Sequence, residues 1–152
     1  MKKQMFKFFA MIILVIMIAF VSALASASAQ SPGHNLTASV PFEFSVGDKA
    51  MPAGDYSIGR LNSDGAALRI SNQESNKSVS RLTQDVQASQ PKATSLLVFR
   101  RYGDQYFLAQ VWLVGEKTGR EFSKTDREKS LESEIAKNNT EMETVTVIAQ
   151  LH

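Results

Sequence analysis

The stretch Leu96–Leu113, LLVFRRYGDQYFLAQVWL, contains two of the three tyrosines and the only tryptophan of the chain. Two runs rich in Val, Phe, Tyr and Leu flank the dipeptide Gly103-Asp104. Glycine adopts the positive φ of tight hairpin turns without steric cost. The stretch therefore predicts a β-hairpin, and large side chains on both faces of its strands favour a central place in a sheet.

Two registers of this hairpin are open. A two-residue loop places Phe99 opposite Leu108, and a three-residue loop places Phe99 opposite Ala109. A shift of one residue exchanges the two faces of a strand, so burial selects strongly between the registers. We favour the three-residue loop, because it gathers the apolar side chains more cleanly on one face.

In the favoured register Arg100, Tyr102 and Tyr106 share the polar face of the hairpin. Arginines beside tyrosines suit a cation–π contact or an anion site. An arginine stem that covers a tyrosine ring on a solvated face is the commoner arrangement. These three residues are the candidates for contact with a partner.

The first 29 residues have the order of a secretory signal peptide. A basic start precedes the apolar run Phe8–Leu24, and Ala27-Ser28-Ala29 then offers small residues for cleavage before Gln30. The sequence therefore predicts export to the periplasm or the medium. The apolar run approaches the length of a membrane-spanning helix, so an uncleaved N-terminal anchor is the alternative, and only then is a membrane a partner.

Composition excludes several classes of function. Three of the 17 basic residues lie in the signal segment and all 15 acidic residues follow it, which leaves 14 basic residues and a mature net charge of −1. This charge gives no indication of a nucleic-acid partner. The absence of cysteine excludes disulfides, thiolate metal sites and thiol catalysis.

The rest of the chain reads as a flexible lead over residues 30–38 and a single β-domain over residues 39–152. Turn signals recur about every ten residues, which favours a small antiparallel β-sandwich or barrel of about seven or eight strands. Residues Gln84–Lys92 form a polar break in this pattern. Besides the hairpin, apolar alternation predicts strands at 40–46, 55–61, 66–71, 78–83, 120–122 and 143–151.

One helix is predicted over Ser123–Asn138, before the last strand. Thr125 and Glu128 have the spacing of a capping box at its start. Leu131 and Ile135 lie four residues apart and fall on one face, while the remaining positions are charged or small. The helix is therefore expected to cover one face or one end of the β-domain with a narrow apolar stripe.

Three motifs resemble a group of small exported proteins of unassigned function from acidobacterial genomes. They are VPFEFSVGD at 40–48, MPAGDY at 51–56 and VFRRYGDQYFL at 98–108. The resemblance covers most of the mature chain, from Val40 to about Leu131. It implies a bacterial exported β-domain, and it implies no activity, cofactor or catalytic residue.

The chain offers little for catalysis. His34 lies in the flexible lead and His152 is the last residue, whereas a catalytic triad or a multi-histidine metal site needs rigidly oriented imidazoles. The sequence therefore predicts no catalytic, cofactor-binding or metal-binding residue and no cofactor.

Carboxylate pairs are the remaining route to hydrolysis. Glu43, Asp55, Asp104 and Glu121 lie on or beside predicted strands, and glycoside hydrolysis uses two such groups across a sugar. Turn chemistry and surface positions account for these residues better than catalysis does.

Three hypotheses of function follow. The first is an exported non-enzymatic β-domain that binds a protein, a glycan or an envelope component at the bacterial envelope or outside the cell. The second is a β-barrel that holds a small apolar ligand, lined by Phe42, Phe44, Phe99 and Phe107. The third is a carboxylate-pair hydrolase that acts on glycans.

Overall fold

Eleven strands and one helix make up residues 35–137 and 142–152, which are the residues that the computed structural model describes. They belong to one unit that runs from Gly33 to His152. The predicted signal peptide, residues 1–29, lies outside the described residues. The mainly β class and the single helix before the last strand are confirmed. The expected seven or eight strands are too few, because several strands have only three to five residues and leave a weak pattern.

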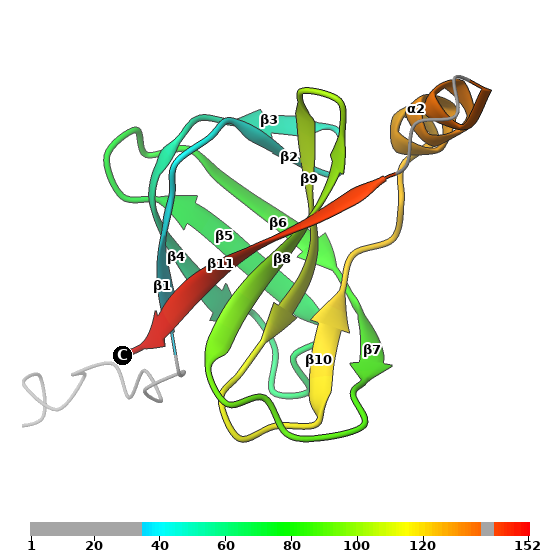
Figure 1. Ribbon diagram of the computed structural model, residues 1–152. Helices are drawn as coiled ribbons and strands as arrows, with labels where there is room; N and C mark the ends of the chain where they lie inside the picture. Colours follow the sequence, from blue (N-terminus) through cyan, green and yellow to red (C-terminus); the bar gives the residue numbers. More distant parts are fainter. Residues whose placement is uncertain (1–34, 138–141) are drawn as a thin grey trace, which may run out of the picture. The chain divides into compact units, whose positions relative to one another are not determined.

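The elements follow the chain in the order shown in Figure 1. Their bounds are β1 Leu36–Val40, β2 Phe44–Val46, β3 Lys49–Met51, β4 Gly54–Arg60, β5 Ala67–Asn72, β6 Ser78–Leu82, β7 Gln84–Gln87, β8 Ser95–Tyr102, β9 Gln105–Trp112, β10 Thr118–Glu121, α2 Asp126–Lys137 and β11 Glu143–Leu151.

The strands form one sheet in the order β3-β2-β9-β8-β11-β1-β4-β5-β6, and β10 joins β7 to β9. The sheet curls into a nearly closed barrel (Figure 1). The last strand, β11, lies between β8 and β1 and is antiparallel to both. At the two ends of the order, side chains bridge β3 and β6, since Lys49 donates to the Ser78 carbonyl at 2.7 Å and Arg81 lies 4.0 Å from Asp48.

The core of the barrel contains a cluster of aromatic rings. Phe42 and Phe44 each meet Phe99 edge-on with ring centroids 5.2 Å apart, and Phe44 meets Tyr56 in the same way at 5.0 Å. Such geometry is the preferred one for aromatic pairs. These rings fill the middle of the barrel, and aliphatic side chains complete the core around them.

The register of the β8–β9 hairpin combines both alternatives. Beside the turn the loop has two residues and Phe99 lies opposite Leu108, so the favoured three-residue loop is wrong there. A β-bulge between Val98 and Phe99 then shifts the pairing, and Leu97 lies opposite Val111 as the three-residue register requires. The extra residue in β9 lets side chains on both sides of the bulge reach the core.

The structure corrects the expected start of the β-domain. Residues 36–38 of the predicted flexible lead belong to β1, where Leu36 and Ala38 are buried and the strand pairs with β4 along its whole length. The predicted strand over 40–46 is interrupted at residues 41–43, where the chain leaves β1 and enters β2. Burial of alternate side chains stabilises β1. The polar residues before and within this strand obscure its apolar pattern in the sequence.

The predicted polar break at Gln84–Lys92 begins with a strand. Gln84–Gln87 is β7, which pairs with β10 so that Val86 lies opposite Gly119. Most β7 side chains are exposed. The strand therefore depends mainly on backbone hydrogen bonds, and apolar alternation does not reveal it.

Helix α2 begins at Asp126, three residues after the predicted start at Ser123, and the predicted cap is confirmed, since Thr125 Oγ1 accepts a hydrogen bond from the Glu128 backbone N–H at 3.2 Å. Its buried residue is Glu128, whereas Leu131 and Ile135 are only half-buried. The expected apolar stripe is therefore not the main docking surface. Among the residues described, the helices fall short of the length and apolarity needed to span a membrane.

Candidate functional site

A cavity of about 220 Å³ opens at the end of the barrel where β1 and β5 begin and β4 ends. Its wall is aliphatic, because the strands that converge there direct small and medium apolar residues inward. We call it the barrel-end cavity. The wall consists of Leu36, Ile58, Leu68, Val111 and Leu113 with Gly59 and Gly119, and the rim consists of Arg60, Glu116, Thr118 and Arg120.

The two arginines of the rim are held differently. Arg60 lies 3.7 Å from the Glu116 carboxylate, and both side chains are largely exposed, at 40% and 46%. Arg120 forms an ion pair with Asp85 at 2.5 Å and also donates to the backbone carbonyl of Asp64. Arg60 therefore has one long contact to a largely exposed partner, and Arg120 has two close contacts.

Two glycines allow the rim to form. A Cβ atom on Gly119 would lie 2.6 Å from ring carbons of Trp112, so only glycine lets β10 lie directly against that ring. Gly65 has a φ of +67°, and a Cβ there would lie 3.1 Å from the Arg120 guanidinium and 3.2 Å from Arg60 Cδ. The turn at Gly65 therefore lies close to the Arg120 guanidinium and to the Arg60 stem, and a side chain there would crowd both.

The predicted aromatic lining of a ligand cavity is wrong. Phe42, Phe44 and Phe99 pack against one another in the core, and Phe107 contacts Tyr102 with ring centroids 5.8 Å apart. None of the four lines the barrel-end cavity. Sequence reasoning missed the true lining because its residues come from the ends of several strands, and Leu36 was assigned to the lead.

The three candidate partner-binding residues are not gathered on one free surface. Arg100 and Tyr102 share one face of β8 but are only 8% and 2% exposed. Tyr106 lies on the opposite face and stacks on Phe42, with ring centroids 4.1 Å apart. The cation–π contact of the hairpin is made by Arg101, whose guanidinium carbon lies 5.5 Å from the centre of the Tyr106 ring. The expected solvated face is thus covered.

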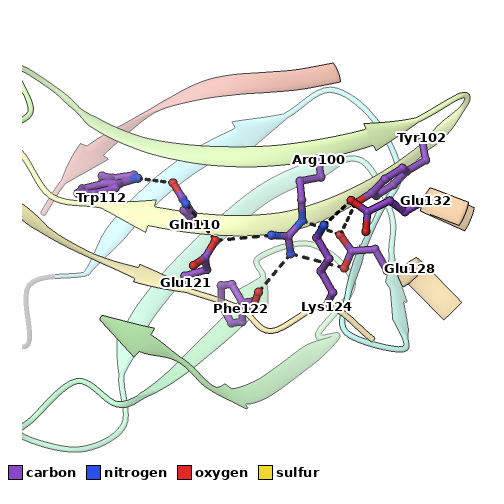
Figure 2. A network of polar contacts seen from close by, with 9 residues as sticks. All are labelled: Arg100, Tyr102, Gln110, Trp112, Glu121, Phe122, Lys124, Glu128 and Glu132. Carbon is purple, nitrogen blue, oxygen red and sulfur yellow. Dashed lines mark hydrogen bonds and ion pairs between the residues drawn. The ribbon is translucent and has the colours of Figure 1, made fainter. Parts of the chain in front are cut away.

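What covers Arg100 is a polar network that fastens α2 to β8 (Figure 2). Arg100 Nε donates to Glu128 Oε1 at 2.6 Å, and another of its guanidinium nitrogens donates to the Phe122 carbonyl at 3.1 Å. The Tyr102 hydroxyl donates to the same Glu128 oxygen at 3.1 Å. Glu121 lies 3.7 Å from the Arg100 guanidinium. We call these five residues the Arg100 network, and its buried partners satisfy one another.

Two buried tyrosines hold their protons more tightly than usual. Burial raises the pKa of Tyr102, and the nearby Glu128 carboxylate raises it further. Burial also raises the pKa of Tyr56, whose hydroxyl donates to the Pro52 carbonyl at 2.5 Å. In both cases the ionised form would be a negative charge away from water.

Raising the pH above about 10 is therefore expected to destabilise the fold. The unfolded chain releases tyrosine protons near pH 10, while Tyr56 and Tyr102 keep theirs in the folded chain. Their contribution is fully present below that pH and is lost as the pH rises toward the folded pKa values, by up to about 1.4 kcal/mol per pH unit for each tyrosine. Urea unfolding curves at several pH values measure the slope. Tyr102→Phe should reduce it, and an unchanged slope in that variant would contradict the assignment.

The carboxylates considered for hydrolysis lie on separate elements. Glu43 is exposed between β1 and β2, Asp55 is exposed on β4, and Asp104 is exposed in the hairpin turn. Glu121 on β10 accepts a hydrogen bond from Gln110 at 3.1 Å as well as contacting Arg100. Within residues 35–137 and 142–152, acidic and histidine side chains form no group of three or more that could hold a metal ion.

Comparisons of the chain with protein-family models, with curated proteins and with solved structures found no match. The resemblance to exported acidobacterial proteins therefore stays a prediction.

Proposed function

We propose that the chain is an exported, non-enzymatic β-domain that binds a small molecule with an apolar body in the barrel-end cavity. The observation that carries the proposal is an aliphatic wall that opens to solvent at a rim with charged side chains. Ligand pockets typically combine an apolar lining with a few polar groups, and small barrels hold single small ligands.

The size of the cavity limits its ligand. An engineered cavity of about 150 Å³ in another protein binds benzene. The barrel-end cavity, at about 220 Å³, is roughly half as large again and has room for about six to ten non-hydrogen atoms. A short alkyl chain or a single ring fits this volume.

The other parts of the proposal rest on the sequence. Export is supported by the order of charged, apolar and small residues over residues 1–29. A small ligand replaces the protein, glycan or envelope component first considered, because Arg100 and Tyr102 are buried and offer no surface to such a partner. The four carboxylates considered for hydrolysis, all in the described part of the chain, lie on separate elements and do not form a pair.

We expect 1-hexanol to bind the protein, with a Kd in the high micromolar to millimolar range, as is usual for so few atoms. Titration followed by methyl NMR should shift the methyl signals of Ile58 and Val111, which line the cavity. Leu113→Trp fills the mouth and should abolish binding. Leu82→Trp adds the same ring at a side chain that is 76% exposed, and it should leave binding unchanged.

Two results would overturn the proposal. One is the absence of any shift with saturating 1-hexanol. The other is equal binding by the wild type and Leu113→Trp, because the alcohol would then occupy another place.

A further inference from the structure

We infer that the ligand of the barrel-end cavity is an anionic amphiphile, a carboxylate on a short alkyl chain or ring, and that Arg60 pairs with its head group. This inference rests on the proposed function, because it assigns the polar end of a ligand whose apolar end occupies the cavity. It adds the chemical class of the ligand, and it names Arg60 as the residue that favours an anionic head group over a neutral one.

The arginines that line the cavity offer a site for an anion. Arg120 and Arg60 each face one carboxylate, Asp85 at 2.5 Å and Glu116 at 3.7 Å, so the pair of Arg60 is the longer and weaker one. A guanidinium presents paired N–H donors that match the two oxygens of a carboxylate. An apolar wall next to such a donor suits a molecule with a carboxylate at one end.

Arg60 is the arginine that is free to exchange partners. Arg120 is held by Asp85 at 2.5 Å and by the Asp64 carbonyl. Within the described part of the chain, the ion-pair partner of Arg60 is the Glu116 carboxylate at 3.7 Å, and exposed pairs of this kind contribute little stability. Glu116 belongs to the connection between β9 and β10, and its side chain is 46% exposed. A ligand carboxylate can therefore displace Glu116.

The position of Arg60 on its strand places the head group next to the wall. Ile58 and Arg60 are two residues apart on β4 and thus lie on the same face, about 6.6 Å from each other along the strand. Arg60 also lies opposite Leu68, which belongs to the wall. A carboxylate on Arg60 thus directs its apolar chain past Leu68 into the cavity.

The test compares three probes that share one chain, namely hexanoate, 1-hexanol and hexylammonium. Hexanoate should bind about tenfold more tightly than 1-hexanol, since hydrogen bonds to charged groups are worth a factor of about 10–100 and the displacement of Glu116 uses part of it. Arg60→Gln should weaken hexanoate about tenfold and leave 1-hexanol unchanged. Arg69→Gln, which alters an exposed arginine on the neighbouring strand β5, should leave both unchanged.

Glu116→Gln gives a change in the opposite direction. It removes the carboxylate that competes for Arg60, so hexanoate should bind a few-fold more tightly while 1-hexanol is unaffected. A merely structural role of the ion pair would not strengthen binding of one probe alone.

The outcomes separate the two proposals. Equal binding of hexanoate and 1-hexanol overturns the anion assignment and leaves the cavity as a binding site. Tightest binding of hexylammonium also overturns it and makes Glu116 the head-group residue. If none of the three probes binds, the proposed function itself fails.

Discussion

Phe99→Ala should lower the free energy of unfolding by about 3–5 kcal/mol. The Phe99 side chain is fully buried, at 0% exposure, and it contacts the edges of two other rings in the middle of the barrel. Its removal leaves a cavity that β8 cannot fill, because β8 is fixed between β9 and β11. Urea unfolding followed by the fluorescence of Trp112, the only tryptophan, measures the loss.

A control for this prediction is Leu82→Ala. Leu82 is 76% exposed on β6, so its truncation should change the free energy of unfolding by less than about 0.5 kcal/mol. A loss below about 1 kcal/mol for Phe99→Ala would mean that the ring is not part of the core.

Glu128→Ala should cost about 3 kcal/mol, the lower end of the range for breaking a buried ion pair. The change leaves the buried Arg100 guanidinium without its 2.6 Å partner and Tyr102 without an acceptor. The Phe122 carbonyl and Glu121 still face Arg100, which limits the loss. The same unfolding measurement applies.

Glu132→Ala provides the matched control on the same helix. Its carboxylate lies 2.6 Å from Lys124, the same distance as in the buried pair, but the two side chains are 41% and 30% exposed. The cost should stay below about 1 kcal/mol. The double variant Arg100→Met with Glu128→Leu should recover part of the loss, because no charge is then left buried alone, although the Tyr102 hydroxyl still lacks its acceptor. Equal costs for Glu128→Ala and Glu132→Ala would show that burial does not strengthen the Arg100 pair.

Much of the fold could be predicted because burial imposes a period of two on each strand. The strands around Tyr56 and Ile58, and around Leu68 and Ile70, lie within about two residues of the predicted bounds, and these side chains are buried as expected. The strands that were missed pair through the backbone without an apolar pattern, as β7 does, or follow a polar segment, as β1 does.

The hairpin shows why register is harder to predict than strand position. Each register alone placed some large apolar residue on the polar face, and this conflict is resolved by a bulge that shifts the pairing between Val98 and Phe99. Whether a bulge forms depends on how the side chains of the whole barrel pack. One strand pair considered by itself does not contain that information.

The candidate site could be predicted least. The wall of the barrel-end cavity gathers residues from five strands and one connection, and only the closed barrel brings them together. The Arg100 network has a partial signal in the sequence, since Thr125 and Glu128 have capping-box spacing. Thr125 makes the expected contact, but the Glu128 carboxylate bonds to Arg100, because a buried guanidinium without its carboxylate would cost more than an unpaired neutral N–H.

The position of β11 between β8 and β1 affects when the domain can fold. Leu36 near the start of the described chain pairs with Leu151 near its end. Strand β8 also pairs with β11, the strand that contains Leu151. Contacts between such distant residues carry a large loop-closure entropy and slow the folding of β-proteins. The barrel can close only after β11 has been synthesised and has reached β8 and β1. A chain that crosses a membrane in an unfolded form would thus stay open during transit and complete its fold on arrival.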